Sequence, residues 1–377
     1  MSALIRFACQ MALWTGLLVS IGHLMAKDPT SKLLVCPMQP PDPDGYRRGL
    51  RGKLSTAEEG HNVVINGDLN RDGKVPWLFF TAELKSALSP QFWGDKAATA
   101  SRSSNPKYAD PLPPILDFHQ QLKAAGIALW IVPVPAKVAV YPQHCISTNG
   151  STTGWVSEKR RIDRSHEKFY ELLHKEGLTV VDLTDEFRWP KGEAKQSRRF
   201  CLTDSHWSGT GVRVAAMSLG ERVKKAGWYP SVPKLKFQTE PLSVEITGDL
   251  ATLFNEKKPP REKLDLTRVF QMVDGKPVSV ADDPHSPILL LGDSHTLVFH
   301  DPTMYAEGCG MADHLAEQLG FALDVIGVRG SGANAARLNW RRRDDPLVGK
   351  KLVIWCFSMR EFTENTDGWR VIPITKR

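Results

Sequence analysis

Short apolar runs alternate with segments of helical periodicity along most of this chain, and this alternation constrains the fold more than any other feature. Apolar residues dominate Ile127–Val134, Leu178–Leu183 and Pro287–Leu291. Two further runs follow at Ala322–Val328 and Lys351–Phe357. Runs of this length without regular polar alternation are typical of strands buried on both faces of a parallel sheet.

The segments between these runs have the spacing of amphipathic helices. Apolar residues recur at helical intervals across residues 115–125, and Gly126 ends that pattern. Residues 157–176 are charged and helix-like, and residues 212–226 form another amphipathic segment. Strands that alternate with helices predict an α/β fold, with a mainly parallel sheet flanked by helices on both faces and right-handed crossovers.

The N-terminal part and one internal segment depart from this pattern. Residues 1–26 are interpreted as a signal peptide or an N-terminal membrane anchor, because residues 7–26 contain no Asp, Glu, Lys or Arg. A helix of that length spans about 30 Å, enough to cross a hydrocarbon core. Residues 27–60, rich in Pro, Asp, Gly and Arg, are interpreted as a linker. We expect one catalytic domain over residues 61–377, in which residues 229–285 show no buried-strand pattern and form an insertion over a sheet edge or over the site.

Both interpretations of the N-terminus place the remainder of the chain outside the cytoplasm, in the periplasm or cell envelope. Leu24-Met25-Ala26 is a poor cleavage site, which favours an anchor. The chain carries 49 Lys and Arg against 42 Asp and Glu. This small excess is spread along the chain without a zinc-finger spacing or a basic stripe, so we expect no nucleic-acid partner. The last apolar run lies close to Arg377, so we expect no added carbohydrate-binding domain.

The cysteine content excludes a disulfide-scaffold miniprotein, since there are six cysteines in 377 residues. Five of them follow the N-terminal apolar segment, so at least one is free or pairs outside the chain. Cys36, Cys145 and Cys201 lie near predicted loops and are the expected disulfide partners, with their pairing left open. Cys356 lies in an apolar run and is interpreted as a small buried hydrophobic residue.

A serine follows the third apolar run, at the place where open α/β sheets bind their ligands. Gly292-Asp293-Ser294 comes directly after Leu291. The glycine permits a tight turn, and the start of a following helix would direct backbone N–H groups toward an oxyanion near the serine. Asp and Ser are also good helix caps, so the triplet by itself fits a structural role as well.

A base for this serine is offered by the loop that precedes residues 212–226. Asp204 and His206 lie two residues apart, so the carboxylate can hold one imidazole nitrogen while the other faces outward. Ser208 and Thr210 in the same loop are alternative caps for the following helix. An Asp-x-His pair combined with a serine at a strand end predicts nucleophilic catalysis.

Several motifs, in this order along the chain, resemble the alginate O-acetyltransferase family of the AlgJ and AlgX type, whose domain is SGNH-hydrolase-like. The strongest match is the Asp-x-His-Trp signature in Thr203–Trp207. The strand opening at Trp77 is similar to the family's Gly-Trp-Leu-Phe, although Pro76 replaces the glycine. The resemblance covers roughly residues 61–360, and its other segments are Gly126–Pro142 with Pro-x-Pro-x-Lys and Tyr-Pro, Val180–Leu183, Gly248–Leu250 and Gly292–Ser294.

The resemblance implies a catalytic triad of Ser294 as nucleophile, His206 as general base and Asp204 as the residue that orients the base. The Asp-His pair precedes the serine in the chain, the reverse of the order in ordinary SGNH esterases. This order favours the acetyltransferase family over a secreted lipase.

Two further residues are weaker candidates for contacts to substrate. Asn334 lies in a Gly-rich loop after the fourth apolar run, where an SGNH enzyme carries its Gly-x-Asn, so it is a candidate for the oxyanion hole. A turn asparagine is the alternative interpretation. Arg360 follows the last run near the family's Trp-Glu-x-x-x-Arg ending and is a candidate for a sugar or carboxylate contact, although Cys356 replaces the usual acid.

The resemblance implies an exported O-acetyltransferase that acts on an extracytoplasmic polysaccharide, alginate-like or another exopolysaccharide, through an acetyl-serine. It also implies a multipass membrane O-acyltransferase as the partner that supplies acetyl groups. A carbohydrate acetylesterase with the same triad and an inactive polysaccharide-binding scaffold remain alternatives. We expect no cofactor and no metal, because residues 68–73 match only the first half of a calcium loop and Phe79 occupies the position that requires Glu.

Overall fold

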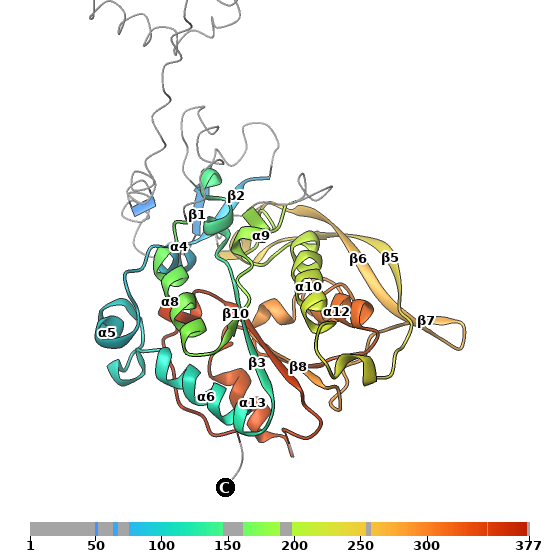
Figure 1. The fold of residues 1–377 in the computed structure, drawn as a ribbon. Coiled ribbons are helices and arrows are strands. Elements are labelled where there is room, and N and C mark those ends of the chain that lie inside the picture. The colour runs from blue at the N-terminus through green and yellow to red at the C-terminus, as the bar shows by residue number, and fades with distance from the viewer. Residues whose placement is uncertain are drawn as a thin grey trace, which may run out of the picture. The chain divides into compact units, whose positions relative to one another are not determined.

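A five-stranded parallel sheet lies at the centre of the computed structural model (Figure 1). Every neighbouring pair of strands in it is parallel. This sheet and the helices around it confirm the predicted α/β class. The strands lie in the spatial order β4 (Thr179–Val180), β3 (Ala128–Val134), β10 (Leu352–Ser358), β8 (Ile288–Gly292) and β9 (Asp324–Gly327).

The residues that the structure describes fall within one compact unit, residues 42–377. The predicted membrane segment 7–26 lies outside the described residues, and so do residues 68–73, which match half of a calcium loop. The predicted linker 27–60 also lies outside them, apart from Leu50 and Arg51. No helix in the described part of the chain is long and apolar enough to span a bilayer. The described ranges are 50–51, 63–66, 75–145, 161–188, 198–253, 258–344 and 346–374.

Helices cover both faces of the sheet because its strands are apolar on both sides. In β10, Val353, Trp355 and Phe357 face one core, and Ile354 and Cys356 face the other. The first core is completed by α4 (Thr81–Ala87), α6 (Leu112–Ala124), α8 (Arg164–Lys175) and α13 (Ala335–Arg342), and the second by α10 (Gly209–Val223) and α12 (Met311–Leu319). In Figure 1, α6 and α8 lie to the left of the sheet, and α10 and α12 lie to its right.

Short elements complete the described fold. Strands β1 (Val63–Asn66) and β2 (Trp77–Phe80) form a separate antiparallel pair. The short α-helices are α5 (Ala97–Ala100), α7 (Lys137–Val140), α9 (Thr184–Arg188), α11 (Asp249–Leu253) and α14 (Glu361–Glu364). The 3-10 helices are η1 (Gly94–Lys96), η2 (Pro106–Tyr108), η3 (Pro142–His144), η5 (Tyr229–Ser231) and η6 (Ser294–Thr296).

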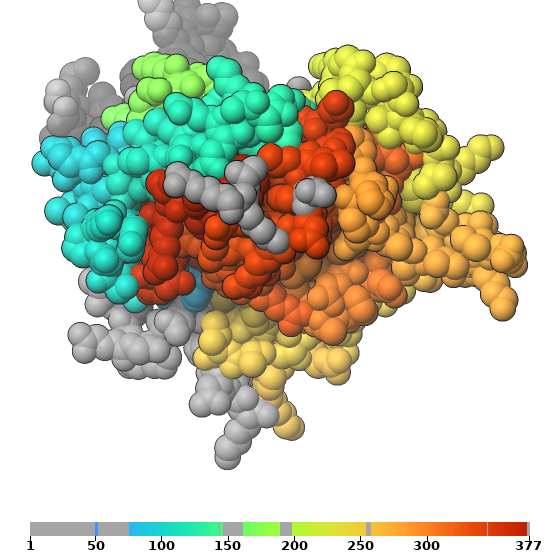
Figure 2. Space-filling model, turned by 90° about the horizontal axis from the view of Figure 1, so that it is seen from below, coloured from blue at the N-terminus to red at the C-terminus, as the bar shows by residue number. Residues whose placement is uncertain are grey.

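Residues 229–285, predicted as an insertion without a buried-strand pattern, contain a three-stranded antiparallel sheet that the sequence analysis did not predict. Its order is β5 (Gln238–Ile246), β6 (Glu262–Val273) and β7 (Lys276–Ser279). Strand β5 is mostly exposed and β6 buries only alternate residues in its first half, so neither has the continuous apolar run of a strand buried on both faces. The β6–β7 hairpin projects at the right-hand edge of both views (Figure 1, Figure 2).

Two further expectations need correction. The second predicted strand is reduced to Thr179–Val180 at the edge of the sheet, and the chain then turns into α9, where Asp182 Oδ1 accepts a bond from the Thr184 N–H. Cys201 is a buried free thiol, not a disulfide partner, and lies 3.5 Å from the Trp207 carbonyl oxygen. Cys356 is buried, as predicted.

Candidate active site

Ser294 lies in a tight turn at the carboxyl end of β8. Gly292 is required there, because a Cβ at this position would lie 1.7 Å from the Cys356 carbonyl oxygen on the neighbouring strand. Asp293 fixes the turn, since its carboxylate accepts bonds from the N–H groups of His295 (2.9 Å) and Ser358 (2.7 Å). The serine hydroxyl is therefore presented at the carboxyl edge of the sheet by a turn that these hydrogen bonds hold.

Asp204 and His206 lie in a narrow loop closed by a β-bridge between Phe200 and Trp207. Asp204 Oδ1 accepts bonds from both the backbone N–H of His206 (2.8 Å) and its Nδ1 (2.6 Å). His206 Nε2 lies 2.7 Å from Ser294 Oγ. The structure thus brings all three predicted triad residues into one hydrogen-bonded chain, although 88 positions separate His206 from Ser294 in the sequence. Ser208 caps α10 by accepting a 3.2 Å bond from the Gly211 N–H, as the capping interpretation of this residue predicts.

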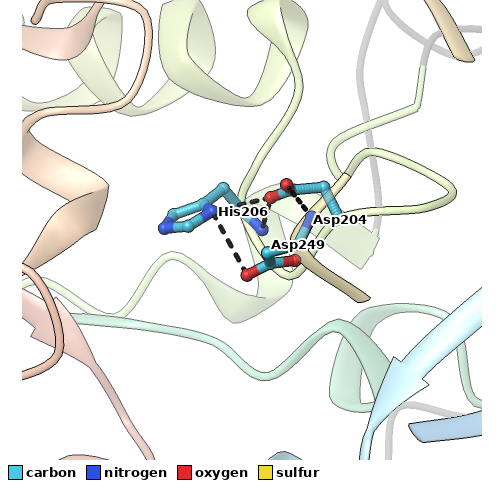
Figure 3. Close-up of side chains that lie close together, drawn as sticks. All are labelled: Asp204, His206 and Asp249. Carbon is cyan, nitrogen blue, oxygen red and sulfur yellow. Dashed lines mark hydrogen bonds and ion pairs between the residues drawn. The ribbon is translucent and has the colours of Figure 1, made fainter. Parts of the chain in front are cut away.

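Two residues that the sequence analysis did not assign to the site complete the surroundings of Asp204. Its second oxygen, Oδ2, accepts bonds from the backbone N–H of Asp249 (2.8 Å) and from the hydroxyl of Tyr305 (2.5 Å). The Asp249 carboxylate in turn accepts bonds from the N–H and the hydroxyl of Ser205. Figure 3 shows Asp204 and Asp249 converging on the His206 ring, with Asp249 Oδ2 3.9 Å from Nδ1.

The sequence carried unequal signals for these two residues. Gly248-Asp249-Leu250 is one of the family-like motifs, and Gly248 is needed because a Cβ there would lie 2.1 Å from the Thr203 carbonyl oxygen. Tyr305 belongs to no motif, and its partner Asp204 is 101 positions away in the sequence. Only the folded chain identifies Tyr305 as part of the site.

The charges in this cluster shift the ionisation of its members. Burial alone would lower the pKa of His206, but the adjacent charge of Asp204 and its hydrogen bond outweigh burial and raise that pKa to about 9. Burial alone would raise the pKa of Asp204. The charge of His206 and four hydrogen bonds to the carboxylate outweigh burial and hold this pKa below its usual range. The pair therefore rests as imidazolium and carboxylate at neutral pH.

A second histidine packs against His206 in a different charge state. His295 is fully buried, and its ring centroid lies 4.7 Å from that of His206. Its Nδ1 lies 3.1 Å from Asp293 Oδ1, yet burial outweighs this carboxylate and lowers the pKa of His295 to about 4. A neutral ring thus borders His206 and adds no positive charge beside it.

Two buried ionisable residues hold the backbone of the Asp-x-His loop. Lys137 is fully buried, and its Nζ donates to the carbonyl oxygens of Leu78 (2.7 Å), Leu202 (2.8 Å) and Asp204 (3.2 Å). Glu262, from β6, accepts bonds from the Leu202 N–H (2.6 Å) and from the N–H of the next residue. Leu202 is therefore bonded on one side to a cation and on the other to a carboxylate. The segment 229–285 helps to position the site through Glu262.

Asn334 is bound to the C-terminal segment of its own chain. Its Nδ2 donates to the Gly368 carbonyl oxygen (2.6 Å), and its Oδ1 accepts bonds from Arg337 and from the Arg370 N–H. These contacts give the side chain a structural role in joining two segments. They fit the turn asparagine interpretation.

Arg360 is likewise engaged with its own chain. Its Nη1 lies 3.1 Å from Glu83 Oε1 and 3.0 Å from the hydroxyl of Ser358, the residue whose N–H binds Asp293. The sequence makes Arg360 a candidate for a contact to a sugar or a carboxylate of the substrate. The carboxylate that it contacts here is that of Glu83, in its own chain. The guanidinium also lies near enough to act electrostatically on Asp293.

One group of side chains in the described ranges has donor atoms close enough together for a metal ion. The ligand atoms of Asp204, His206 and Asp249 lie within 4.8 Å of one another. The Asp204 oxygens and both Asp249 oxygens already accept the hydrogen bonds described above, and His206 Nδ1 binds Asp204. The arrangement is that of a histidine whose ring is held in place by carboxylates.

The parallel sheet, the serine after a central strand and the Asp-x-His loop facing it define an SGNH-hydrolase-like domain. The family model described as SGNH hydrolase-like domain, acetyltransferase AlgX, matches residues 71–359. The chain belongs to this family of O-acetyltransferases.

Curated relatives agree with this assignment. The probable alginate O-acetylase AlgJ of Pseudomonas fluorescens is 27% identical over 257 residues, which cover 66% of this chain and 60% of that protein. For AlgJ of Pseudomonas aeruginosa the identity is 27% over 200 residues, 51% of this chain and 44% of that protein. The chain therefore matches about three fifths or less of these relatives' length.

Two solved structures share the fold. The O-acetyltransferase domain of Pseudomonas putida AlgJ has a TM-score of 0.55 at 21% identity, covering 80% of this chain and 92% of that one. Pseudomonas aeruginosa AlgX has a TM-score of 0.54 at 17% identity, covering 80% of this chain and 64% of that one.

Proposed function

We propose that this protein is an exported O-acetyltransferase that moves acetyl groups to hydroxyls of an extracytoplasmic polysaccharide, alginate-like or another exopolysaccharide, through an acetyl-serine on Ser294. The observation that carries the proposal is the chain from Asp204 through His206 to Ser294, with contacts of 2.6 Å and 2.7 Å. Membership of an O-acetyltransferase family supports acetyl as the transferred group.

In the first half of the reaction, neutral His206 takes the proton of Ser294 through Nε2 while Oγ attacks the acetyl carbonyl carbon of the donor. The negative charge that develops on the carbonyl oxygen is met by the backbone N–H of Ser294 itself, because the N–H groups of His295 and Thr296 are bonded to Asp293. The tetrahedral intermediate then expels the donor's leaving group, which takes the proton from His206. Asp204 stabilises the imidazolium that exists between these two steps.

In the second half, a sugar hydroxyl replaces the donor. His206 accepts the hydroxyl proton, the sugar oxygen attacks the acetyl carbonyl carbon, and the bond to Ser294 Oγ breaks. Oγ recovers its proton from His206, and the acetylated sugar leaves. The Ser294 proton leaves with the donor's leaving group and the sugar's proton replaces it on Oγ, so Ser294 and His206 end the cycle as they began it and no cofactor is consumed.

The proposal includes a setting and a partner. Residues 7–26, which carry no Asp, Glu, Lys or Arg, support export to the periplasm or cell envelope and attachment to the inner membrane. A multipass membrane O-acyltransferase, the partner that the family resemblance implies, would pass the acetyl groups across the membrane.

The experiment measures the fate of the acetyl group from a small activated ester such as p-nitrophenyl acetate. With an oligosaccharide acceptor, a transferase forms acetylated sugar at the expense of free acetate. Equal acetate release with and without acceptor would instead show an acetylesterase. Failure to react with the ester or with a serine-directed phosphonate would show an inactive scaffold.

A further inference from the structure

The loop that follows the candidate nucleophile contains two residues in an unfavourable backbone conformation. Phe299 and Tyr305 have φ values of 62° and 76°, in the left-handed region that favours glycine. Bulky residues persist there only when the surroundings hold them, and such positions cluster at functional sites. The loop is closed by a 3.0 Å bond from the Phe299 N–H to the Met304 carbonyl oxygen and by a bond from the Cys309 N–H to Phe299.

The backbone conformation of this loop brings the Tyr305 side chain to Asp204. Its hydroxyl lies 2.5 Å from Asp204 Oδ2, the oxygen that does not bind His206. Phe299 packs beside Tyr305 with ring centroids 6.2 Å apart. The loop that carries Ser294 is thereby joined to the loop that carries Asp204 by a contact independent of the one between Ser294 and His206.

We propose that Tyr305 is a positioning residue for the acetyl transfer, which fixes the Asp204 carboxylate against His206 and sets the basicity of that histidine. This inference rests on the proposed function. The hydroxyl donates to a carboxylate, and hydrogen bonds to charged groups are stronger than those between neutral groups. Tyr305 and the Asp249 N–H together stop the carboxylate from rotating away from the imidazole.

Removing the hydroxyl has a defined electrostatic consequence. Without the tyrosine hydroxyl, one hydrogen bond no longer stabilises the negative charge of the carboxylate. The carboxylate then attracts the imidazolium more strongly. His206 then releases its proton at higher pH, and its orientation becomes less defined. A purely structural tyrosine would affect the melting temperature and leave the pH dependence of the reaction unchanged.

The substitution Tyr305→Phe changes one contact and leaves every other charge around the pair in place. It keeps the ring and its packing against Phe299. Among the described residues, the other ionisable groups that act on Asp204 or His206 include Asp249 from α11, Arg360 after β10, His295 from η6, Lys137 from α7 and Cys201.

The test is the rate of acyl-enzyme formation from p-nitrophenyl acetate as a function of pH. We expect Tyr305→Phe to move the midpoint of the acid limb upward by about half to one pH unit, since only part of a charged hydrogen bond acts on His206. The plateau rate should fall about tenfold because the base is less well placed. Tyr229→Phe is the matched control, since its hydroxyl binds the Leu319 carbonyl oxygen and not the triad.

The midpoint of the limb decides the outcome even if the variant is partly unfolded, because a midpoint does not depend on the fraction of active enzyme. An unchanged midpoint, or a downward shift, would overturn the role of Tyr305. A second comparison uses Asp204→Asn, in which adding Tyr305→Phe should cause no further shift, and a full further shift would also overturn it. If the wild type forms no acyl-enzyme, or Ser294→Ala forms as much, the proposed function itself fails before Tyr305 is tested.

Discussion

Replacing Asp204 with Asn removes the charge beside His206 and keeps a side chain of nearly the same size. Burial lowers the pKa of His206, but the Asp204 carboxylate outweighs burial and raises it to about 9. This is about 2.5 pH units above the ordinary value and corresponds to about 3 kcal/mol in favour of the imidazolium. Without the carboxylate, burial dominates, so the pKa of His206 should fall below its ordinary value of about 6.5.

The wild-type protein and the Asp204→Asn variant should therefore have different pH profiles. Acyl-enzyme formation needs neutral His206, so the wild-type rate should rise about tenfold per pH unit and level off near pH 9. In Asp204→Asn the acid limb should lie below about pH 6.5. The plateau rate of the variant should be lower by roughly 10⁴, because the imidazolium that forms during reaction has lost its counter-charge and its tautomer is no longer fixed.

The assay is the initial burst of p-nitrophenolate from p-nitrophenyl acetate, measured across the pH range for both proteins. Asp274→Asn is a matched control, because Asp274 lies exposed in the β6–β7 turn and Asn tolerates its φ of 50°. A variant whose acid limb stays near pH 9 would show that Asp204 does not set the pKa of His206. An unaltered plateau would show that another group is the base.

Three further predictions concern the scaffold of the site. Lys137→Met should cost about 3–5 kcal/mol of unfolding free energy in urea titrations, because it leaves three buried carbonyl oxygens without their donor, while an unchanged urea midpoint would argue against that role. Gly292→Ala should prevent stable folding, judged by circular dichroism, because its Cβ would lie 1.7 Å from the Cys356 carbonyl oxygen. Burial opposes the charge of His300, but its bonds to Asp282 and Asp313 outweigh burial and raise the pKa to about 10. The stability lost in His300→Ala, measured by melting temperature, should therefore be largest below about pH 6.5 and vanish as pH rises through about 10; a pH-independent loss would contradict the ion pairs.

The sequence predicts the central sheet well because its strands are buried on both faces. In β8 every residue is buried, so the strand must be an apolar run that is visible without a structure. Strands β5 and β6 have no such apolar run, because one face of their sheet is largely exposed and polar residues such as Glu240 and Asp265 interrupt them. The sequence therefore does not reveal them. Their existence depends on pairing with each other.

The catalytic candidates divide in the same way. Ser294, His206 and Asp204 lie in short motifs with characteristic local spacing, so they can be selected from the sequence. Tyr305 and Glu262 reach the site from segments distant in the sequence, and nothing local to either residue indicates its partner. Positioning residues are thus found only when the folded chain shows which loop they hold.

The central claim is that Ser294 carries the acetyl group, and mass spectrometry of the acetylated protein tests it most directly. After incubation with p-nitrophenyl acetate and an acid quench, the proteolytic peptide that contains Ser294 should gain the mass of one acetyl group. The gain should be absent in Ser294→Ala and should disappear from the wild type when an acceptor oligosaccharide is added. An acetyl group on a different residue, or equal labelling of Ser294→Ala, would contradict the account.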